Sequence, residues 1–392
     1  MNICMVAASF FPAIVYGGPI FSSYHAALNL AKNEGCKVVV VTTNSNEGMT
    51  LDVQLDRKVK LESDFSVYYF GQSLKNWFPF NLLYGFIKEI RFSDIVHIQA
   101  IFNYTTVIAI IISSVLRKPI VLSPRGCLGD WAMSHRRILK LLWIWCFVVP
   151  ASKRIVFHVT SIQEKQEVFS MFGDVETVII PNGISLEEFE NIQSISKGDF
   201  FQKFCCPKAT TTKCLGEITS VVVSMGRLHP KKGLDILISA FSEFLLDDSG
   251  SILAIAGPDE GDGKRLTELA ISLGVSDRVF FVGLLSGSER LEFLANADVF
   301  VLPSHNENFG NVYLESLLSG TPIIASKNTP WSLVEEYKCG RWVENSVQGV
   351  RESILDVLKL DSGVSERCKE LASGFTWGTI ATSFYEEYKR LI

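Results

Sequence analysis

The chain has 392 residues, of which 47% are hydrophobic and 20% charged, and its formal net charge at pH 7 is −5. This composition excludes a disordered chain, and the length predicts two domains because a single ordinary core does not grow to this size. The net negative charge does not favour nucleic-acid binding, although residues 117–165 hold nine basic and only two acidic side chains.

Cysteine usage and the N-terminal sequence predict a reduced, cytoplasmic protein. The nine cysteines are odd in number and show no CxxC pair or Cys/His metal-binding spacing. Residues 1–12 lack the basic region and the cleavage site of a secretory signal and predict a first strand instead. The longest apolar run, residues 107–116, is well short of the roughly 20 residues that a membrane-spanning helix needs. We therefore expect a cytoplasmic chain that touches at most the inner face of the cytoplasmic membrane.

Short apolar runs alternate with amphipathic segments in the first half, which predicts parallel strands joined by helices. The loop after the first strand contains Gly17 and Gly18, whose backbone N–H groups can approach a ligand without obstruction. The pair equally suits a loop that needs positive φ, and it is not the GxGxxG dinucleotide fingerprint. The expected strands of this half cover residues 1–9, 37–42, 94–99, 119–123, 154–160 and 176–180.

Polar side chains lie at the ends of two of these strands. His97 and Gln99 end the strand 94–99, and Arg125 follows the strand 119–123 beside a glycine. Ligands of open α/β sheets collect at such strand ends, which makes Arg125 a candidate contact for an anion or a sugar. A histidine in such a place is more often structural than catalytic, and both interpretations of His97 stay open.

Residues 134–154 place bulky apolar side chains, including Trp143 and Trp145, between basic ends. One interpretation is a buried helix of the domain with basic caps. The other is a helix face that lies on an anionic membrane. The aromatic-rich segment 76–86 also favours the second interpretation, but neither segment decides between the two interpretations.

The second half repeats the alternation of strands and helices after a poorly patterned stretch at residues 190–218, which predicts a linker. The predicted organisation is a first domain 1–195, a linker 196–218, a second domain 219–374 and a C-terminal helix 375–392. The expected strands of the second domain cover residues 221–225, 252–256, 278–283, 299–302 and 323–325.

Two loops of the second domain carry groups suited to a nucleotide sugar. Arg227 and Lys232 lie five residues apart after the strand 221–225, where two cations beside a helix start suit a diphosphate. Glu307 and Glu315 flank a glycine turn after the strand 299–302, where carboxylates can accept hydrogen bonds from sugar hydroxyls. An ordinary βα unit with surface glutamates is the alternative interpretation. No Walker-type phosphate loop and no Asp-x-Asp triplet occur, so the diphosphate site is expected to need no metal.

Together these motifs resemble retaining glycosyltransferases of family 4, which belong to glycosyltransferase group 1 and have the GT-B fold. The resemblance rests on GRLHPKKG at residues 226–233, on LPS, ENFG and LES with the Glu-x7-Glu pair at residues 302–316, on PNGI at residues 181–184, and on the early GGP loop. It implies two Rossmann-like domains whose parallel sheets face each other across a cleft, with the C-terminal helix crossing back to the first domain. It also implies that the N-terminal domain binds the acceptor and the C-terminal domain the nucleotide sugar.

The resemblance assigns roles to single residues. Arg227 and Lys232 would hold the diphosphate, and Glu307 would contact the donor sugar. Arg125 stands where many members have a histidine and would contact the donor sugar or phosphate as a guanidinium. Glu315 would hold the ribose hydroxyls. The other donor-binding candidates are Gly17, Gly18, Val282, Gly283, Leu284, Asn308, Phe309, Gly310 and Asn311. The acceptor-binding candidates are His97, Gln99 and Asn103.

The function expected from this resemblance is transfer of a hexose-type sugar from a UDP- or GDP-sugar to a saccharide acceptor, with retention and without a metal or other cofactor. The segments SPRG, NENFGNV and TPW resemble a bacterial branch that builds O-antigen, capsule or exopolysaccharide. This resemblance implies that the acceptors are lipid-linked saccharides. A same-face displacement is favoured, because a double displacement needs a carboxylate at the anomeric carbon. The alternatives are a nucleoside-diphosphate-sugar 2-epimerase of the same fold and a non-catalytic sugar-nucleotide sensor.

Overall fold

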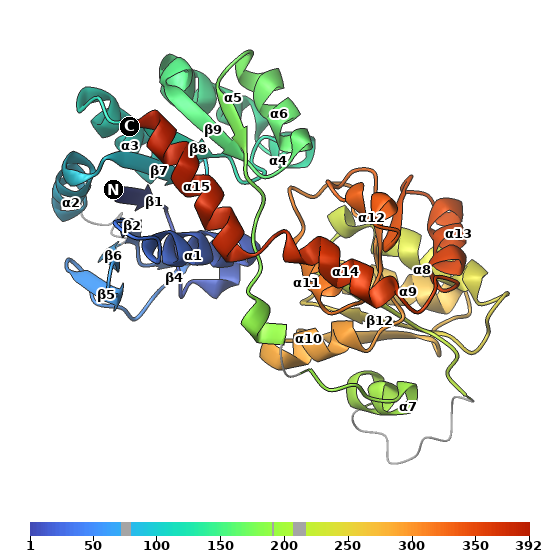
Figure 1. The fold of residues 1–392 in the computed structure, drawn as a ribbon. Coiled ribbons are helices and arrows are strands. Elements are labelled where there is room, and N and C mark those ends of the chain that lie inside the picture. The colour runs from blue at the N-terminus through green and yellow to red at the C-terminus, as the bar shows by residue number, and fades with distance from the viewer. Residues whose placement is uncertain (72–79, 190–191, 207–216) are drawn as a thin grey trace. The chain divides into compact units, whose positions relative to one another are not determined.

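The structure is a computed structural model that describes residues 1–71, 80–189, 192–206 and 217–392 (Figure 1). It divides into two compact units. The first comprises Met1–Gly183 together with Trp377–Ile392, and the second comprises Ile184–Thr376. Each unit is built on a parallel sheet covered by helices, so the expected α/β class with two Rossmann-like domains is confirmed.

Within the described residues, the sheet of the first unit has eight strands in the order β10-β9-β8-β7-β1-β2-β6-β5. The edge strand β5 is antiparallel to β6, and the other neighbours are parallel. The strand order reverses between β1 and β7, which brings the segments after these strands together at the carboxyl edge. The strands are β1 (Asn2–Val6), β2 (Lys37–Thr43), β5 (Lys58–Glu62), β6 (Phe65–Phe70), β7 (Ile95–Gln99), β8 (Ile120–Ser123), β9 (Ile155–Val159) and β10 (Thr177–Ile179).

Alternate residues of these strands supply two apolar cores, one on each face of the sheet. Ile3 and Met5 of β1 belong to the core that contains Ile380 and Phe384 of α15 (Trp377–Leu391), and α15 lies beside α1 (Figure 1). The intervening residues of β1 belong to the other core. The C-terminal helix therefore completes the first unit, as expected. The other α-helices described in this unit are α1 (Gly18–Ala31), α2 (Phe80–Phe92), α3 (Tyr104–Val115), α4 (Asp130–Ser134), α5 (Arg137–Trp143) and α6 (Ile162–Phe172).

The described strands of the second unit's main sheet are all parallel, in the order β13-β12-β11-β14-β15-β16. Counted from β11 this is the order 3-2-1-4-5-6 of doubly wound sheets, whose ligands bind at the carboxyl ends where the order reverses. The reversal lies between β11 and β14, so the loops after these two strands form the expected binding edge. The strands are β11 (Val221–Met225), β12 (Ile252–Ala256), β13 (Val279–Gly283), β14 (Val299–Leu302), β15 (Ile323–Ser326) and β16 (Gly340–Val343). The helices include α8 (Leu234–Phe244), α9 (Gly263–Ser272), α10 (Gly287–Ala295), α11 (Asn311–Leu318), α12 (Leu333–Glu336), α13 (Val347–Val357) and α14 (Val364–Ser373).

The boundary between the units differs from the predicted one. The chain passes from the first unit to the second between Gly183 and Ile184, before the expected linker begins. Directly after this point the N–H of Ile184 donates to the carbonyl of Phe375 at 2.8 Å. The segment that enters the second unit is therefore paired with the segment that leaves it.

The predicted linker at residues 196–218 is not a linker where the structure describes it. Its first part forms the short helix α7 (Lys197–Phe200) and a π-helix that carry Phe200 and Phe204. Both rings are buried in the core of the second unit, and their centroids lie 5.5 and 5.3 Å from the ring centroid of Phe293. Two aromatic anchors within a polar stretch were too few to give a recognisable pattern. Residues 207–216 lie outside the described part.

Candidate functional site

The loops after β11 and β14 lie against each other at the reversal of the second sheet. The N–H of His305 donates to the carbonyl of Lys231 at 2.8 Å. Gly233, at φ +64°, is so close to the other loop that a Cβ there would stand 2.1 Å from the carbonyl oxygen of Pro303. A side chain does not fit in this space, so the glycine is what lets the two loops meet.

Lys232 and Glu307 form an ion pair across these loops. The ammonium of Lys232 donates to Oε1 of Glu307, and the two side chains are only 14% and 12% exposed. The hydroxyl of Ser304 donates to the same oxygen at 3.2 Å. Burial alone would raise the pKa of Glu307, but the charge and hydrogen bond of Lys232 and the charge of Lys231 hold it below its ordinary value. Glu307 is therefore an ionised acceptor that faces a cation.

Glu315 on α11 pairs with Arg290 on α10, with 3.2 Å between Oε1 and Nη1. The same guanidinium lies 3.1 Å from the carboxylate of Glu188. Burial raises the pKa of Glu315, Arg290 opposes the rise, and Glu188 adds to it. Sequence reasoning found neither partner. The signal that could have indicated a partner is the general rule that a buried carboxylate needs a cation nearby.

Arg227 lies outside the Lys232–Glu307 pair. Its side chain is 57% exposed, and its Nη1 lies 2.8 Å from Oε2 of Glu260, which follows β12. The sequence predicts Arg227 and Lys232 at one diphosphate, whereas the structure brings Lys232 to Glu307 and Arg227 to Glu260. An ion pair with this exposure is weak, so the guanidinium can exchange Glu260 for another anion at little free-energy cost.

Aromatic side chains pack against the turn that leads into α11 and hold its backbone. Gly310 has φ +77°, and a Cβ there would lie 2.6 Å from the ring of Tyr313. Phe309 is buried, and its carbonyl accepts a hydrogen bond from Nε1 of Trp331 at 2.7 Å. These contacts hold the backbone of the turn in one conformation. Donor binding by this turn stays a prediction for Asn308, Phe309, Gly310 and Asn311.

The predicted base-binding residues end β13, at the edge of the second sheet. Gly283 has φ +84°, and its carbonyl accepts from the N–H of Gly257 at 2.7 Å. Leu284 is 72% exposed. The strands β12 and β11 separate β13 from β14, so this segment and the Lys232–Glu307 pair occupy different parts of one edge. Base binding stays a prediction for Val282, Gly283 and Leu284.

In the first unit, Gly17 and Gly18 follow β1 and open α1. Gly17 is the N-cap residue, with φ +69° and open space where a Cβ would stand. The left-handed conformation explains Gly17 by itself. Contact of Gly17 and Gly18 with the donor therefore stays a prediction.

Arg125 and Gln99 come together at the carboxyl ends of β7 and β8. The Nε of Arg125 donates to Oε1 of Gln99 at 2.8 Å, and its Nη1 donates to Oδ1 of Asn182 at 3.2 Å. Both partners are neutral amides, and Arg125 forms no ion pair with any described residue. The guanidinium is thus oriented without being neutralised by a bonded carboxylate. Asn103 is half-buried at the N-cap of α3.

The structure contradicts the acceptor-binding role predicted for His97, which lies fully buried. Its Nδ1 is 2.5 Å from the hydroxyl of Tyr388, and its Nε2 is 2.7 Å from that of Ser123. The Ser123 hydroxyl continues to Nδ1 of His158, whose Nε2 donates to the carbonyl of Ile180 at 2.8 Å. Because that carbonyl can only accept, Ser123 donates to His158, His97 donates to Ser123, and Tyr388 donates to His97. Both nitrogens of His97 are thereby used, and Nδ1 ties α15 to the sheet.

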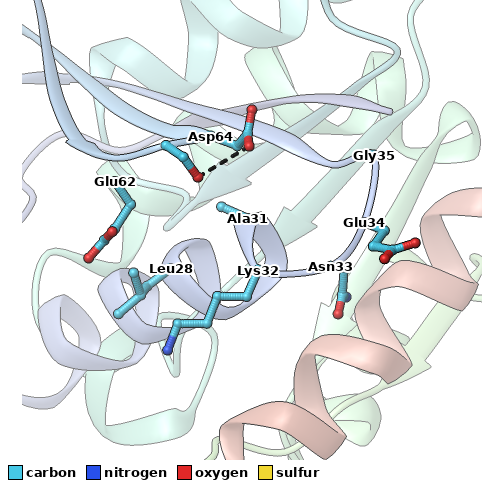
Figure 2. Close-up of a pocket in the computed structure, with 9 residues that line it drawn as sticks. Leu28, Ala31, Lys32, Asn33, Glu34, Gly35, Glu62 and Asp64 are labelled. Carbon is cyan, nitrogen blue, oxygen red and sulfur yellow. Dashed lines mark hydrogen bonds between the residues drawn. The ribbon is translucent and has the colours of Figure 1, made fainter.

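A cavity of about 370 Å³ lies elsewhere, where α1 ends and the β5–β6 turn begins (Figure 2). Glu34, Glu62 and Asp64 line it, and Asp64 accepts from the hydroxyl of Ser63 at 3.3 Å. It adjoins the amino ends of β2 and β6, whereas ligands of such sheets bind at carboxyl ends. None of the predicted site residues lines this cavity.

Residues 216–374, most of the second unit, match the family described as "Glycosyl transferases group 1". This segment is thus similar to group 1 glycosyltransferases. The matched segment contains both the Lys232–Glu307 pair and the Arg290–Glu315 pair. The two pairs therefore belong to the part of the chain that is similar to this family.

Curated relatives of this chain are similar over part of their length. The D-inositol 3-phosphate glycosyltransferase of Streptosporangium roseum is 32% identical over 189 residues, which is 46% of this chain and 40% of the relative. The enzyme of the same name from Acidothermus cellulolyticus is 39% identical over 115 residues, which is 27% of this chain and 26% of the relative. The chain thus matches less than half the length of either relative.

Solved structures resemble both units of the chain. Sucrose-phosphate synthase from Thermosynechococcus elongatus covers 100% of this chain and 98% of its own, with a TM-score of 0.73 and 18% identity. Anabaena Alr3699/HepE in complex with UDP-glucose covers 100% of both chains, with a TM-score of 0.69 and 18% identity. WaaG covers 98% of this chain and 99% of its own, with a TM-score of 0.67 and 16% identity. The chain, with its two Rossmann-like units, thus has the GT-B type of fold.

The described residues lack both a membrane-spanning helix and a metal-binding cluster. No helix in this part of the chain combines the length and the apolar character needed to cross a membrane. No group of three or more His, Cys, Asp and Glu side chains among the same residues is placed to hold a metal ion.

Proposed function

We propose that the chain transfers a hexose-type sugar from a UDP- or GDP-sugar to a saccharide acceptor. The Lys232–Glu307 pair carries the proposal, because it places an ammonium and a carboxylate side by side at the reversal of strand order. A diphosphate suits the ammonium, and sugar hydroxyls suit the carboxylate. The match to group 1 glycosyltransferases and the likeness to a structure in complex with UDP-glucose support a nucleotide sugar as the donor.

In the proposed reaction, the bond between the anomeric carbon and the diphosphate breaks while the acceptor oxygen bonds the same face of that carbon. The proton of the acceptor hydroxyl passes to the departing phosphate oxygen, so the sugar keeps its anomeric configuration. Lys232 stabilises the negative charge that grows on the leaving phosphate, and no metal ion takes part.

The neighbouring side chains take supporting roles in this reaction. Glu307, held by Lys232 and Ser304, orients sugar hydroxyls and does not attack the anomeric carbon. Arg227 adds a second cation once it exchanges Glu260 for phosphate. Glu315 accepts hydrogen bonds from the ribose.

The acceptor that we propose is a lipid-linked saccharide of O-antigen, capsule or exopolysaccharide, glycosylated at the inner face of the cytoplasmic membrane. WaaG, which has the same fold, is described as a glycosyltransferase involved in lipopolysaccharide biosynthesis, and this supports that class of acceptor. The names of the curated relatives support a second candidate, D-inositol 3-phosphate. For that acceptor Arg125 would supply a cation to the phosphate.

A screen of UDP- and GDP-hexoses tests the donor. We expect one of them to raise the melting temperature and to release its nucleoside diphosphate when an acceptor is added. Lys232→Ala should reduce turnover about 100-fold, because it removes the cation at the leaving group. Lys264→Ala, at an 89% exposed side chain of the same unit, is the matched control and should keep full turnover.

The products separate the alternatives. Undiminished turnover of Lys232→Ala would overturn the diphosphate assignment. Conversion of the donor to its 2-epimer without an acceptor would identify an epimerase, and nucleotide binding without any turnover would identify a sensor. Transfer to lipid-linked saccharide or to D-inositol 3-phosphate decides between the two acceptors.

A further inference from the structure

The first unit exposes a row of large apolar side chains along α5 and the π-helix that follows it. Ile138, Leu139, Leu142 and Trp145 are 75%, 64%, 54% and 70% exposed. Three of them, Ile138, Leu142 and Trp145, follow one another by four and three residues, which places them on one face of the helical segment. We call these four side chains the apolar ridge. Its exposure excludes the interpretation of residues 134–154 as a buried helix.

The opposite face of the same segment is firmly packed. Ile144 and Val148 are buried in a core of the first unit. The indole of Trp143 donates to the carbonyl of Ile101 at 3.1 Å, and its ring meets that of Phe147 edge-on at 4.9 Å. The apolar ridge is therefore held in a fixed, outward position by its own helix.

Cations stand at both ends of the apolar ridge. Arg136 and Arg137 precede it, and Lys153 and Arg154 end the turn that follows the π-helix. All four are exposed and form no ion pair within the described residues. An apolar ridge flanked by cations without an acidic partner suits an anionic membrane surface. The apolar side chains can enter the hydrocarbon region while the cations bind the lipid phosphates.

Lys153 and Arg154, which end the turn after the π-helix, also line a cavity of about 640 Å³ at the amino ends of β8 and β9. Arg117, Lys118, Lys153 and Arg154 line this cation cavity, and the single carboxylate among its lining residues, Glu176, is bonded by Arg390. The dipole of α3 explains one cation near its C-terminal end. It does not explain four around one cavity, since like charges repel unless an anion lies between them.

We propose that the first unit docks on an anionic phospholipid bilayer, with the apolar ridge inserted at the interface and a lipid phosphate bound in the cation cavity. A second copy of the chain fits this surface poorly, because the cations around the ridge would face one another. Docking does not depend on the proposed transfer reaction. Vesicle binding can be measured without turnover, so the two proposals fail separately.

Cosedimentation with vesicles tests the ridge. Wild type should bind vesicles of equal parts phosphatidylcholine and phosphatidylglycerol, and bind phosphatidylcholine alone weakly. The double variant Ile138→Ser, Trp145→Ser should bind about tenfold less, because two large apolar side chains no longer enter the interface. The matched control is Leu246→Ser with Ile271→Ser, at positions 86% and 61% exposed on the second unit, and it should bind like wild type.

A second set of variants tests the cation cavity. Substituting Arg117, Lys153 and Arg154 by Gln should lower binding to the anionic vesicles about fivefold for each charge removed and leave binding to phosphatidylcholine unchanged. The charge-matched control replaces Lys264, Lys359 and Lys369 of the second unit by Gln. Unchanged melting temperatures establish that the variants are folded.

Four results would overturn the docking proposal. The first is that wild type does not sediment with anionic vesicles, and the second is that the ridge variant binds as well as its control. The third is that inorganic phosphate stabilises the protein through Arg117 although vesicles do not bind, which would make the cation cavity a site for a soluble anion. Dimers that the ridge variant dissociates would likewise replace the bilayer by a second copy of the chain.

Discussion

The guanidinium of Arg290 lies 3.2 Å from the carboxylate of Glu315 and is the cation that opposes the effect of burial on that carboxylate. Without it, the buried acid would bind a proton more readily and lose the charge that makes it a strong acceptor of hydroxyl hydrogen bonds. The charge of Glu188, the other partner of Arg290, raises the pKa of Glu315. In the proposed function, Arg290 is therefore a positioning residue that would act on the nucleotide through Glu315.

Arg290→Met should weaken nucleotide binding most at low pH. Burial already raises the pKa of Glu315, and loss of Arg290 raises it further, so binding by the variant should recover as the pH rises through that pKa. Calorimetric titration with the nucleoside diphosphate over a pH series measures this. Arg351→Met, which breaks the pair with Asp247, is the control. A loss of binding that is equal at every pH would indicate a merely structural Arg290.

Lys232 and Glu307 should be energetically coupled. Lys232→Ala or Glu307→Ala alone leaves one mostly buried charge without its partner, which is expected to cost about 2 kcal/mol of the free energy of unfolding. The double variant should cost less than the sum of the two single variants. Urea unfolding of the four proteins gives the coupling energy. Strict additivity would show that the two side chains do not stabilise each other.

Transfer activity should survive chelation. Lys232, assisted by Arg227, is proposed to neutralise the leaving diphosphate, so EDTA is expected to leave the rate of nucleotide release unchanged. The assay is run on dialysed protein with and without EDTA. A rate abolished by EDTA and restored by Mn²⁺ would require a metal in the reaction.

Tyr388→Phe should loosen the C-terminal helix. The variant removes the hydroxyl that donates to Nδ1 of His97 and leaves that buried nitrogen without a partner, at an expected cost of about 1–3 kcal/mol in the free energy of unfolding. Denaturant unfolding and limited proteolysis of residues 377–391 report the effect. Tyr385→Phe, on the same helix and only half-buried, should change stability by less than about 0.5 kcal/mol. Equal effects of the two variants would contradict the hydrogen-bond chain.

Mild acid should destabilise the first unit. Burial lowers the pKa of His97 well below its ordinary value of 6.5 and lowers that of His158 to about 3. Below pH 6.5 the unfolded chain therefore binds protons that the folded chain does not. The contribution of these histidines to stability is complete above pH 6.5 and is lost as the pH falls toward about 3. Denaturant unfolding at several pH values gives the slope, which should become shallower in His158→Asn.

Local sequence signals were sufficient for the features that depend on neighbouring residues. Lys232 and Glu307 each follow an apolar strand and a turn, so the pattern places both at carboxyl strand ends. That the two side chains meet depends on β11 and β14 being adjacent, and the doubly wound strand order predicts that these two strands are neighbours. This part of the site could therefore be predicted because the fold was recognised from the sequence.

The partners of the predicted residues were out of reach for the opposite reason. Arg290 and Glu315 lie on different helices, and Tyr388 and His97 are separated by almost the whole chain. Charge and spacing along the sequence do not show which helices become neighbours. His97 accordingly kept two interpretations until the position of α15 decided between them.

The first unit is made from two pieces of chain, and this has a consequence for synthesis. Residues 377–391 supply Ile380 and Phe384 to one of its cores and Tyr388 to its buried hydrogen bonds. During translation, the sheet that begins with β1 must wait, with one face incompletely covered, until the whole second unit has been made. A chaperone that shields apolar surface on nascent chains is therefore expected to stay bound to the first unit until residue 391 has left the ribosome.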